Sequence, residues 1–294
     1  MYKKVSIGLV FLVSFSMINA GTDATYDVYG FYTDFKKVME ELCPPAIAAQ
    51  ISDEERSRVA ETGGSPVYGE IIFDSITALL ADIKLTADDV FYDIGSGLGK
   101  FVLQVYLMTP AKKSIGVEYS KSRCETSQKL KSRGEKIYNE SFKFENGIRK
   151  VFGKPQLAKT KKKTFEYRNE DALEADFSDA TVAFTCSTCF GPEFMQKLTD
   201  KLSDNDGLRI LSLKELPYNE DVHYVKTHML PMTWVKNSPI PVYMYEVDHS
   251  KKAVRSDAKA EEKPVVAVKT ETKSESKPVA AKQVAKNATA VKKS

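Results

Sequence analysis

Cysteine and histidine are scarce in this chain, which has four cysteines and three histidines among 294 residues. Four cysteines do not provide a disulfide framework for a domain of this size. Cys186 and Cys189 have C-x-x-C spacing, but no second cysteine pair or histidine pair accompanies them, so no zinc site is expected. We interpret the pair as small side chains at the end of a core strand, with a redox role as the alternative.

The chain also lacks an apolar run long enough to cross a bilayer comfortably. The most apolar stretch, Val5–Ile18, is shorter than the roughly 20 residues of a spanning helix. It follows Lys3 and Lys4 and precedes the small residue Ala20, so residues 1–20 are predicted to be a secretory signal peptide. No cysteine stands at the cleavage site, so a lipoprotein is not expected. The predicted localisation is secreted, with a periplasmic protein or an uncleaved membrane anchor as the alternative.

The last segment, residues 250–294, has no aromatic residue and a single arginine. Residues 251–294 carry a net charge of +7, whereas the whole chain carries +3, so the body is mildly acidic. A segment of this composition cannot bury enough surface to fold alone and is predicted to be disordered. Its lysines favour contact with nucleic acid or an acidic protein surface, although its interspersed acids argue against tight or sequence-specific binding. A solvated appendage without a partner is the alternative.

The most informative feature that is present is the segment Val90–Lys100, in which an apolar strand leads to Asp93 and then to three glycines at alternating positions, Gly95, Gly97 and Gly99. A helical pattern follows. Glycine permits a tight turn and lets backbone N–H groups approach a ligand without a Cβ in the way. About 20 residues later a second strand ends in Glu118, where a Rossmann-type sheet places the acceptor for a ribose diol. The pattern predicts a nucleotide-like ligand; a turn without a ligand is the alternative.

The position of Asp93 helps to distinguish S-adenosylmethionine (SAM) from a dinucleotide as the ligand. An acid two residues before the first glycine favours SAM, because no phosphate has to be accommodated and a carboxylate suits the cationic amino-acid end of that cofactor. A dinucleotide site would more typically show G-x-G-x-x-G with a helix N-terminus facing a pyrophosphate. The sequence therefore predicts SAM as the cofactor.

The rest of the chain alternates between strand and helix patterns. Apolar residues at helical spacing precede the glycine strand, and strands are predicted near 113–118, 181–186, 208–213 and 241–247. This alternation indicates an α/β fold with a doubly wound, mainly parallel sheet. Residues 21–66 are predicted to form an N-terminal helical segment, and the lysine-rich stretch 154–163 an exposed loop.

Several motifs together resemble the disruptor-of-telomeric-silencing (DOT) family of non-SET histone lysine methyltransferases. The resemblance runs from Val67 to Asp248 and rests on Val67–Glu70, Phe91–Val105, Gly116–Glu118, Phe190–Glu193 and the isolated Trp234. It implies a methyltransferase domain over residues 67–249 with the seven-strand fold of class I SAM-dependent methyltransferases. The implied reaction is methylation of a lysine amine in a protein, with histone or nucleosome as the partner.

The resemblance also implies roles for individual residues. Tyr68 and Glu70 would belong to a loop that folds over SAM, Glu118 would bind the ribose and Asp171 would face the adenine amine. The remaining implied cofactor residues are Asp93, Gly95, Gly97, Gly99, Lys100 and Gln104. Phe190, Trp234 and Tyr243 are candidates for aromatic walls of the lysine channel.

One motif departs from the family. Where the family has two asparagines at the end of the fourth strand, this chain has Cys186 and Ser187, which leaves the Ser187 hydroxyl as the only good hydrogen-bonding side chain there. Three functions stay open: an exported protein lysine methyltransferase, acting in one hypothesis on chromatin of a host cell; an enzyme of the same fold acting on a non-histone protein or a small molecule; and a SAM-binding module without catalysis.

Overall fold

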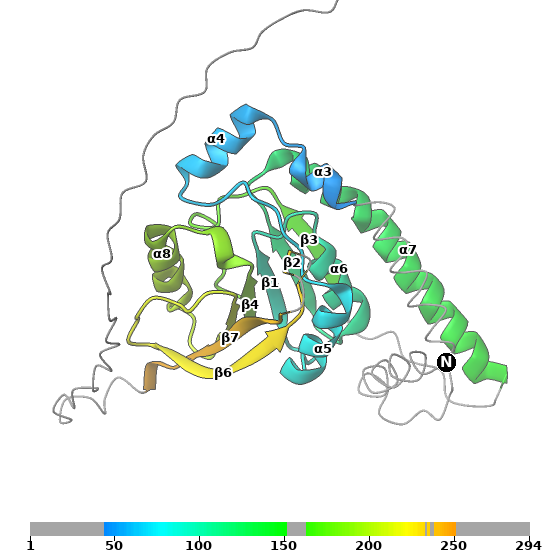
Figure 1. Ribbon diagram of the computed structural model, residues 1–294. Helices are drawn as coiled ribbons and strands as arrows, with labels where there is room; N and C mark the ends of the chain where they lie inside the picture. The colour runs from blue at the N-terminus through cyan, green and yellow to red at the C-terminus, as the bar shows by residue number, and fades with distance from the viewer. Residues whose placement is uncertain (1–43, 152–162, 233, 236–237, 251–294) are drawn as a thin grey trace, which may run out of the picture. The chain divides into compact units, whose positions relative to one another are not determined.

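The computed structural model describes residues 44–151, 163–232, 234–235 and 238–250 (Figure 1). These residues belong to one compact unit, and a second unit, residues 255–294, lies outside the described part. The predicted signal peptide, the tail from residue 251 onward, most of the lysine-rich loop and the first part of the predicted N-terminal helical segment also lie outside it.

The described elements alternate along the chain as the sequence predicts. The helices are α3 (Pro45–Ala49), α4 (Asp53–Glu61), α5 (Phe73–Ile83), α6 (Lys100–Met108), α7 (Lys121–Val151), the short 3₁₀ helix η1 (Ser187–Cys189) and α8 (Pro192–Leu202). The strands are β1 (Val90–Ile94), β2 (Lys113–Val117), β3 (Thr164–Arg168), β4 (Val182–Thr185), β5 (Arg209–Ser212), β6 (Val222–Leu230) and β7 (Ile240–Val247).

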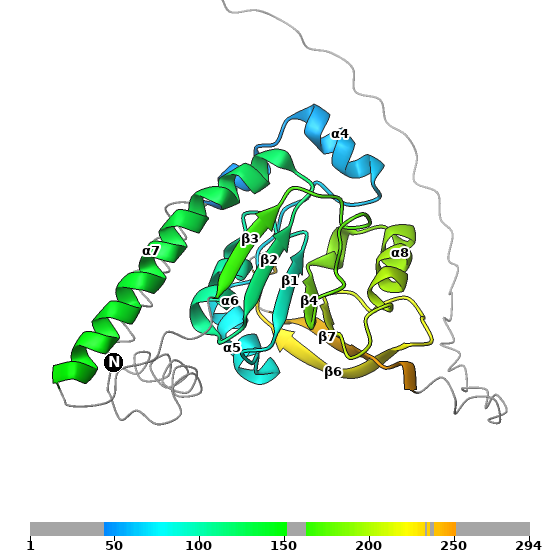
Figure 2. The ribbon, with the colours of Figure 1, turned by 180° about the vertical axis from the view of Figure 1, so that it is seen from behind.

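The seven strands form one sheet in the order β3-β2-β1-β4-β5-β7-β6. The first five strands are mutually parallel, and β7 runs antiparallel between β5 and β6. Helices α5 and α6 cover one face and α8 covers the other (Figure 2). The prediction of a seven-strand, mainly parallel, doubly wound sheet is confirmed. The strand order reverses between β1 and β4, and ligands bind such sheets at the carboxyl ends of the strands beside this reversal.

Burial explains why the strands beside this reversal form as predicted. All five residues of β1 and all four of β4 are buried, and continuous apolar runs are typical of strands covered on both faces. β3 and β6 are not among the strands predicted from the sequence. β6 is an edge strand with a mostly exposed surface, and β3 directly follows the lysine-rich stretch.

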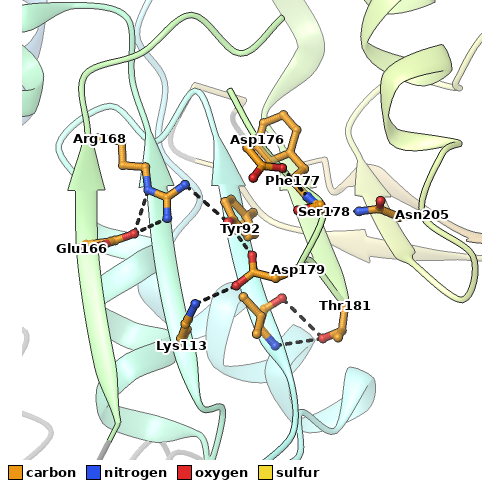
Figure 3. Close-up of polar contacts among 11 residues, drawn as sticks. Tyr92, Lys113, Glu166, Arg168, Asp176, Phe177, Ser178, Asp179, Thr181 and Asn205 are labelled. Atoms are coloured by element: carbon orange, nitrogen blue, oxygen red, sulfur yellow. Dashed lines mark hydrogen bonds and ion pairs between the residues drawn. The ribbon is translucent and has the colours of Figure 1, made fainter. Parts of the chain in front are cut away.

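A polar network ties β1, β2 and the segment before β4 together (Figure 3). Asp179 accepts hydrogen bonds of 2.7 Å from both the Tyr92 hydroxyl and Lys113 Nζ. Burial, and then the bond to Asp179, raise the pKa of the Tyr92 hydroxyl well above its usual range. Phe177 packs edge-on against the Tyr92 ring at 5.2 Å. These contacts fix the strand residue that immediately precedes Asp93.

No helix in the described part of the chain is long and apolar enough to span a membrane.

Candidate cofactor site

The glycine segment forms a tight turn between β1 and α6. Gly95, Gly97 and Gly99 have φ angles of +77°, +55° and +75°, in the left-handed region that favours glycine. The backbone N–H of Gly95 donates 2.8 Å to the carbonyl of Val117, which holds the turn against the end of β2. A Cβ on Gly97 would lie 2.5 Å from Tyr68 Cε2, so the turn and the Tyr68 loop approach each other closely.

A cleft opens above this turn, at the carboxyl ends of β1, β2 and β4. Most of the sequence-predicted cofactor residues line it: Tyr68, Glu70, Asp93, Gly95, Gly97, Lys100, Glu118 and Asp171. Phe184, Phe190 and Phe194 line it as well. The structure thus brings together residues as far apart in the sequence as Tyr68 and Phe194. Their roles toward a ligand remain predictions.

Glu118 lies at the end of β2 and is 7% exposed. Its carboxylate accepts 2.8 Å hydrogen bonds from the backbone N–H groups of Gly97 and Ser120. Burial raises the pKa of Glu118, while the neighbouring Arg123 and the two backbone donors act in the opposite direction. A carboxylate held in this way has a fixed direction and can accept hydrogen bonds from the two hydroxyls of a ribose.

Asp93 is the most unusual group in the cleft. It is 3% exposed, and within the described residues its carboxylate receives no hydrogen bond. Burial, and then the charge of Glu118, raise its pKa to about 8. A buried carboxyl group without a partner fits a cationic ligand. SAM carries an ammonium and a sulfonium, and these positive charges would compensate the Asp93 carboxylate. The residues present at this site therefore fit SAM.

The loop of residues 62–72, which we call the cofactor loop, supplies one wall of the cleft. The Tyr68 hydroxyl donates to Glu70, and Glu70 forms an ion pair of 2.7 Å with Lys100 at the start of α6. The Glu70 and Lys100 side chains are only 16% and 15% exposed. The loop is therefore fastened to the helix that follows the glycine turn, although the two are 30 residues apart in the sequence.

Asp171 also lines the cleft and lies in the segment that follows β3. Its side chain accepts a 2.9 Å bond from the backbone N–H of Leu173, which fixes a turn. The role of Asp171 toward the adenine amine stays a prediction.

Five predicted site residues lie away from the cleft lining: Gly99, Gln104, Ser187, Trp234 and Tyr243. Gly99 packs under the Tyr167 ring, and Gln104 is fully buried, donating to the Phe73 carbonyl and Thr77 Oγ1. Ser187 is fully buried and bonds to Ser212 Oγ at 2.8 Å, so its hydroxyl is used within the fold. Tyr243, on β7, packs against the core beneath α8.

Of the three proposed channel aromatics, Phe190 alone lines the cleft. Its ring lies 3.3 Å from where a Cβ on Gly95 would be, and its carbonyl accepts a 2.8 Å bond from Lys214 Nζ. Trp234 is 38% exposed and instead covers the backbone of the cofactor loop at Gly69, where a Cβ would lie 2.7 Å from its ring.

Sequence reasoning overlooked Arg123, Phe184 and Phe194, which also line the cleft. The two phenylalanines are indistinguishable from core residues in a sequence, since each also packs in a hydrophobic cluster. Arg123 gives only a weak signal, a basic residue in the first turn of a helix that follows the Glu118 strand.

The strand order, the glycine turn and the two buried acids define a class I methyltransferase fold with a SAM site. Residues 50–229 match the sequence model of the family described as "Histone methylation protein DOT1", more than half of the chain. The chain belongs to the DOT1 family, as its motifs predict.

Individual relatives agree with this assignment. The chain is 26% identical over 167 residues to "Histone-lysine N-methyltransferase, H3 lysine-79 specific" of Drosophila melanogaster, covering 56% of this chain and 8% of that protein. A protein of the same description from Caenorhabditis elegans is 26% identical over 231 residues, covering 71% of this chain and 22% of the relative. The chain thus spans less than a quarter of the length of either relative.

Among solved structures, an RNA methyltransferase from Salinibacter ruber in complex with S-adenosyl-L-homocysteine is 18% identical with a TM-score of 0.42, covering 61% of this chain and 94% of that one.

Proposed function

We propose that this chain transfers a methyl group from SAM to the side-chain amine of a lysine in a protein, with histones as the acceptor class. The observation that carries the proposal is the buried, unpaired Asp93 beside Glu118 in the cleft of a DOT1-family chain. The histone part is supported by the printed descriptions of the two animal relatives.

Different residues of the cleft would bind different parts of the cofactor. Asp93 would hold the cationic amino-acid end of the cofactor, Glu118 the ribose and Asp171 the adenine amine. SAM supplies an activated methyl group on a sulfonium, and its departure leaves a neutral thioether. The protein therefore needs mainly to orient an amine and to exclude water.

The acceptor amine has to arrive without its proton, because an ammonium has no lone pair for attack. Phe184, Phe190 and Phe194 make one part of the cleft apolar, and an apolar environment disfavours the charged form of lysine. Phe190 is held in place through its carbonyl by Lys214. We propose that Phe190 guides the acceptor side chain, and that Trp234 and Tyr243 act in substrate binding outside the cofactor cleft.

The test is methyl transfer from radiolabelled SAM to nucleosomes, free histones and a cell lysate. A Gly97→Arg variant serves as the control, because its side chain would have to occupy the space of Tyr68 and the cofactor. Label on nucleosomes or histones, absent with the variant, is the expected result. Equal label with both proteins would contradict the assignment of the cleft.

A second candidate is favoured by Cys186 and Ser187. Cys186 lines the cleft and Ser187 bonds internally, so neither offers the amide that the family has at these positions. This arrangement favours a non-histone protein or a small molecule as the acceptor. Label on a lysate component alone would select this candidate, and SAM binding without any transfer would select a binding module.

We further propose that residues 1–20 direct export of the protein, with delivery into a host cell as one hypothesis. The lysine-rich tail would then bring the enzyme to nucleic acid or to an acidic protein surface. The support is the composition of the two ends alone. The N-terminus of protein recovered from the culture medium should begin at Gly21. Protein retained in the producing cell with Met1 in place would contradict export.

A further inference from the structure

Arg123 has an environment that an ordinary surface arginine does not have. It is the third residue of α7, is 4% exposed and lines the cleft. Burying a guanidinium is costly unless its N–H groups and its charge are matched. The groups that match it are therefore informative about what it does.

Two backbone carbonyls and one aromatic ring surround the guanidinium. Nε donates 3.0 Å to the carbonyl of Ala48 in α3, and Nη2 donates 2.6 Å to the carbonyl of Pro66 in the cofactor loop. The guanidinium carbon lies 5.3 Å from the centroid of the Tyr68 ring, within the range of a cation–π contact. One side chain of α7 thus holds two points of the cofactor loop.

The same cation also acts on Glu118. Burial raises the pKa of Glu118, and Arg123 is the strongest influence that opposes this rise. The other acids that face Glu118 work against ionisation: Glu55 from α4 raises the pKa of Glu118, and Glu118 in turn raises that of Asp93. Arg123 therefore opposes the combined effect of burial and of Glu55 on the Glu118 carboxyl group.

We propose that Arg123 is a positioning residue for SAM binding, which holds the cofactor loop against the cleft and supplies a positive charge to the cleft that Glu118 also lines. The inference rests on the SAM site of the proposed function and is independent of the acceptor. Lysine cannot replace it fully, because an ammonium is a point charge without the planar fork that bonds two carbonyls in one plane. A purely structural arginine would affect folding and leave the pH dependence of SAM binding unchanged.

The experiment compares Arg123→Gln and Arg123→Lys with Arg133→Gln, an exposed arginine on the same helix. The dissociation constant of SAM is measured by calorimetry between pH 6 and pH 9, without any acceptor. Arg123→Gln should weaken SAM binding by about tenfold or more, since charge-assisted bonds are lost. It should also move the pH midpoint of binding upward, because removing the cation raises the pKa of Glu118.

Arg123→Lys separates the two roles. It should leave the pH midpoint in place, weaken SAM binding by a smaller factor of about three, and speed amide hydrogen exchange in residues 62–72. If Arg123→Gln folds and binds SAM with the affinity and midpoint of the Arg133→Gln control, the proposal is wrong. If Arg123→Gln does not fold, Arg123→Lys decides, and control-like affinity and exchange overturn the proposal. Failure of the unchanged protein to bind SAM would instead overturn the proposed function.

Discussion

The ring of Tyr167 occupies the space that a side chain on Gly99 would need. A Cβ on Gly99 would lie 2.1 Å from Tyr167 Cε1, and the Tyr167 hydroxyl donates 2.9 Å to the Gly99 carbonyl. β3, which carries Tyr167, thus fixes the end of the glycine turn from beneath. Gly99 therefore acts on the site through packing, whereas Gly97 faces the cleft.

Gly99→Ala should destabilise the fold by about 3 kcal/mol. Alanine is strained in the left-handed backbone conformation, and its methyl group would also clash with the buried Tyr167 ring. Gly207→Ala is the matched control. Gly207 has φ +77°, but no atom lies within 4 Å of where its Cβ would be. Gly207→Ala should therefore lower the free energy of unfolding by only about 1 kcal/mol. Urea unfolding of both variants gives the two free energies of unfolding. Equal losses would show that Tyr167 moves aside without cost.

Gly97→Ala should act on the ligand more than on the fold. Its Cβ would meet the edge of the Tyr68 ring at 2.5 Å, and Tyr68 lies in the cofactor loop, which can move outward. We expect SAM affinity to fall by about tenfold, with a loss of stability of about 1 kcal/mol from the backbone. Calorimetric titration of SAM, together with urea unfolding, measures both. Unchanged affinity would mean that the loop does not need to contact the turn.

SAM binding should release protons near pH 7. Burial raises the pKa of Asp93 from 3.8 to about 8, so the free protein holds this carboxyl protonated below that pH. The cationic cofactor favours the carboxylate, and affinity should therefore rise from pH 6 to about pH 8 and then level off. Calorimetry in two buffers of different ionisation enthalpy counts the protons.

The same group affects the stability of the free protein. Because the pKa in the folded state is raised, the contribution of Asp93 to stability is present below about pH 4 and is lost as the pH rises toward 8. Asp93→Asn should remove both this loss and the proton release on SAM binding. Proton release that persists in Asp93→Asn would assign the titration to another group.

Local patterns in the sequence predicted the strand–turn–helix unit and its ligand because each part of that unit lies within a short segment. The apolar run of β1, the glycines and Glu118 are all readable without knowledge of the rest of the fold. The class of fold followed from the alternation of elements. The cofactor loop could be placed only through the family resemblance, since its contact with Lys100 joins residues 30 apart.

Other parts could not be predicted because they depend on which groups meet in space. Ser187 has a hydroxyl suited to catalysis, but its partner Ser212 is 25 residues away, on the neighbouring strand. Arg123 bonds to Ala48, 75 residues before it. A sequence shows one member of each pair and gives no indication of its partner.

Ser187→Ala should therefore reduce stability and leave SAM binding unchanged. Ser187 Oγ accepts a 3.0 Å bond from the backbone N–H of Lys214 and pairs with Ser212, so its removal leaves buried polar groups with fewer partners. We expect a loss of about 1–2 kcal/mol in the free energy of unfolding. Thr188→Ala, whose hydroxyl contacts only a cysteine sulfur in the described structure, is the control. A large drop in SAM affinity in Ser187→Ala alone would restore Ser187 to the site.

Gly69 and Trp234 offer a direct test of how the cofactor loop is held. Gly69 has no positive φ, so Gly69→Ala carries no backbone strain, and the three atoms nearest to its Cβ belong to Trp234, the nearest at 2.7 Å. Gly69→Ala should weaken SAM binding by about fivefold, because the loop that carries Glu70 shifts. Trp234→Ala removes the obstacle.

The double variant Gly69→Ala/Trp234→Ala should then bind SAM no more weakly than Trp234→Ala alone, a coupling of about 1 kcal/mol in the mutant cycle. The reason is that the two residues act through one contact, and once the ring is gone the added methyl group has room. Dissociation constants of SAM for the four proteins complete the cycle. Additive losses would mean that each residue affects the cleft independently, without a shared contact between Gly69 and Trp234.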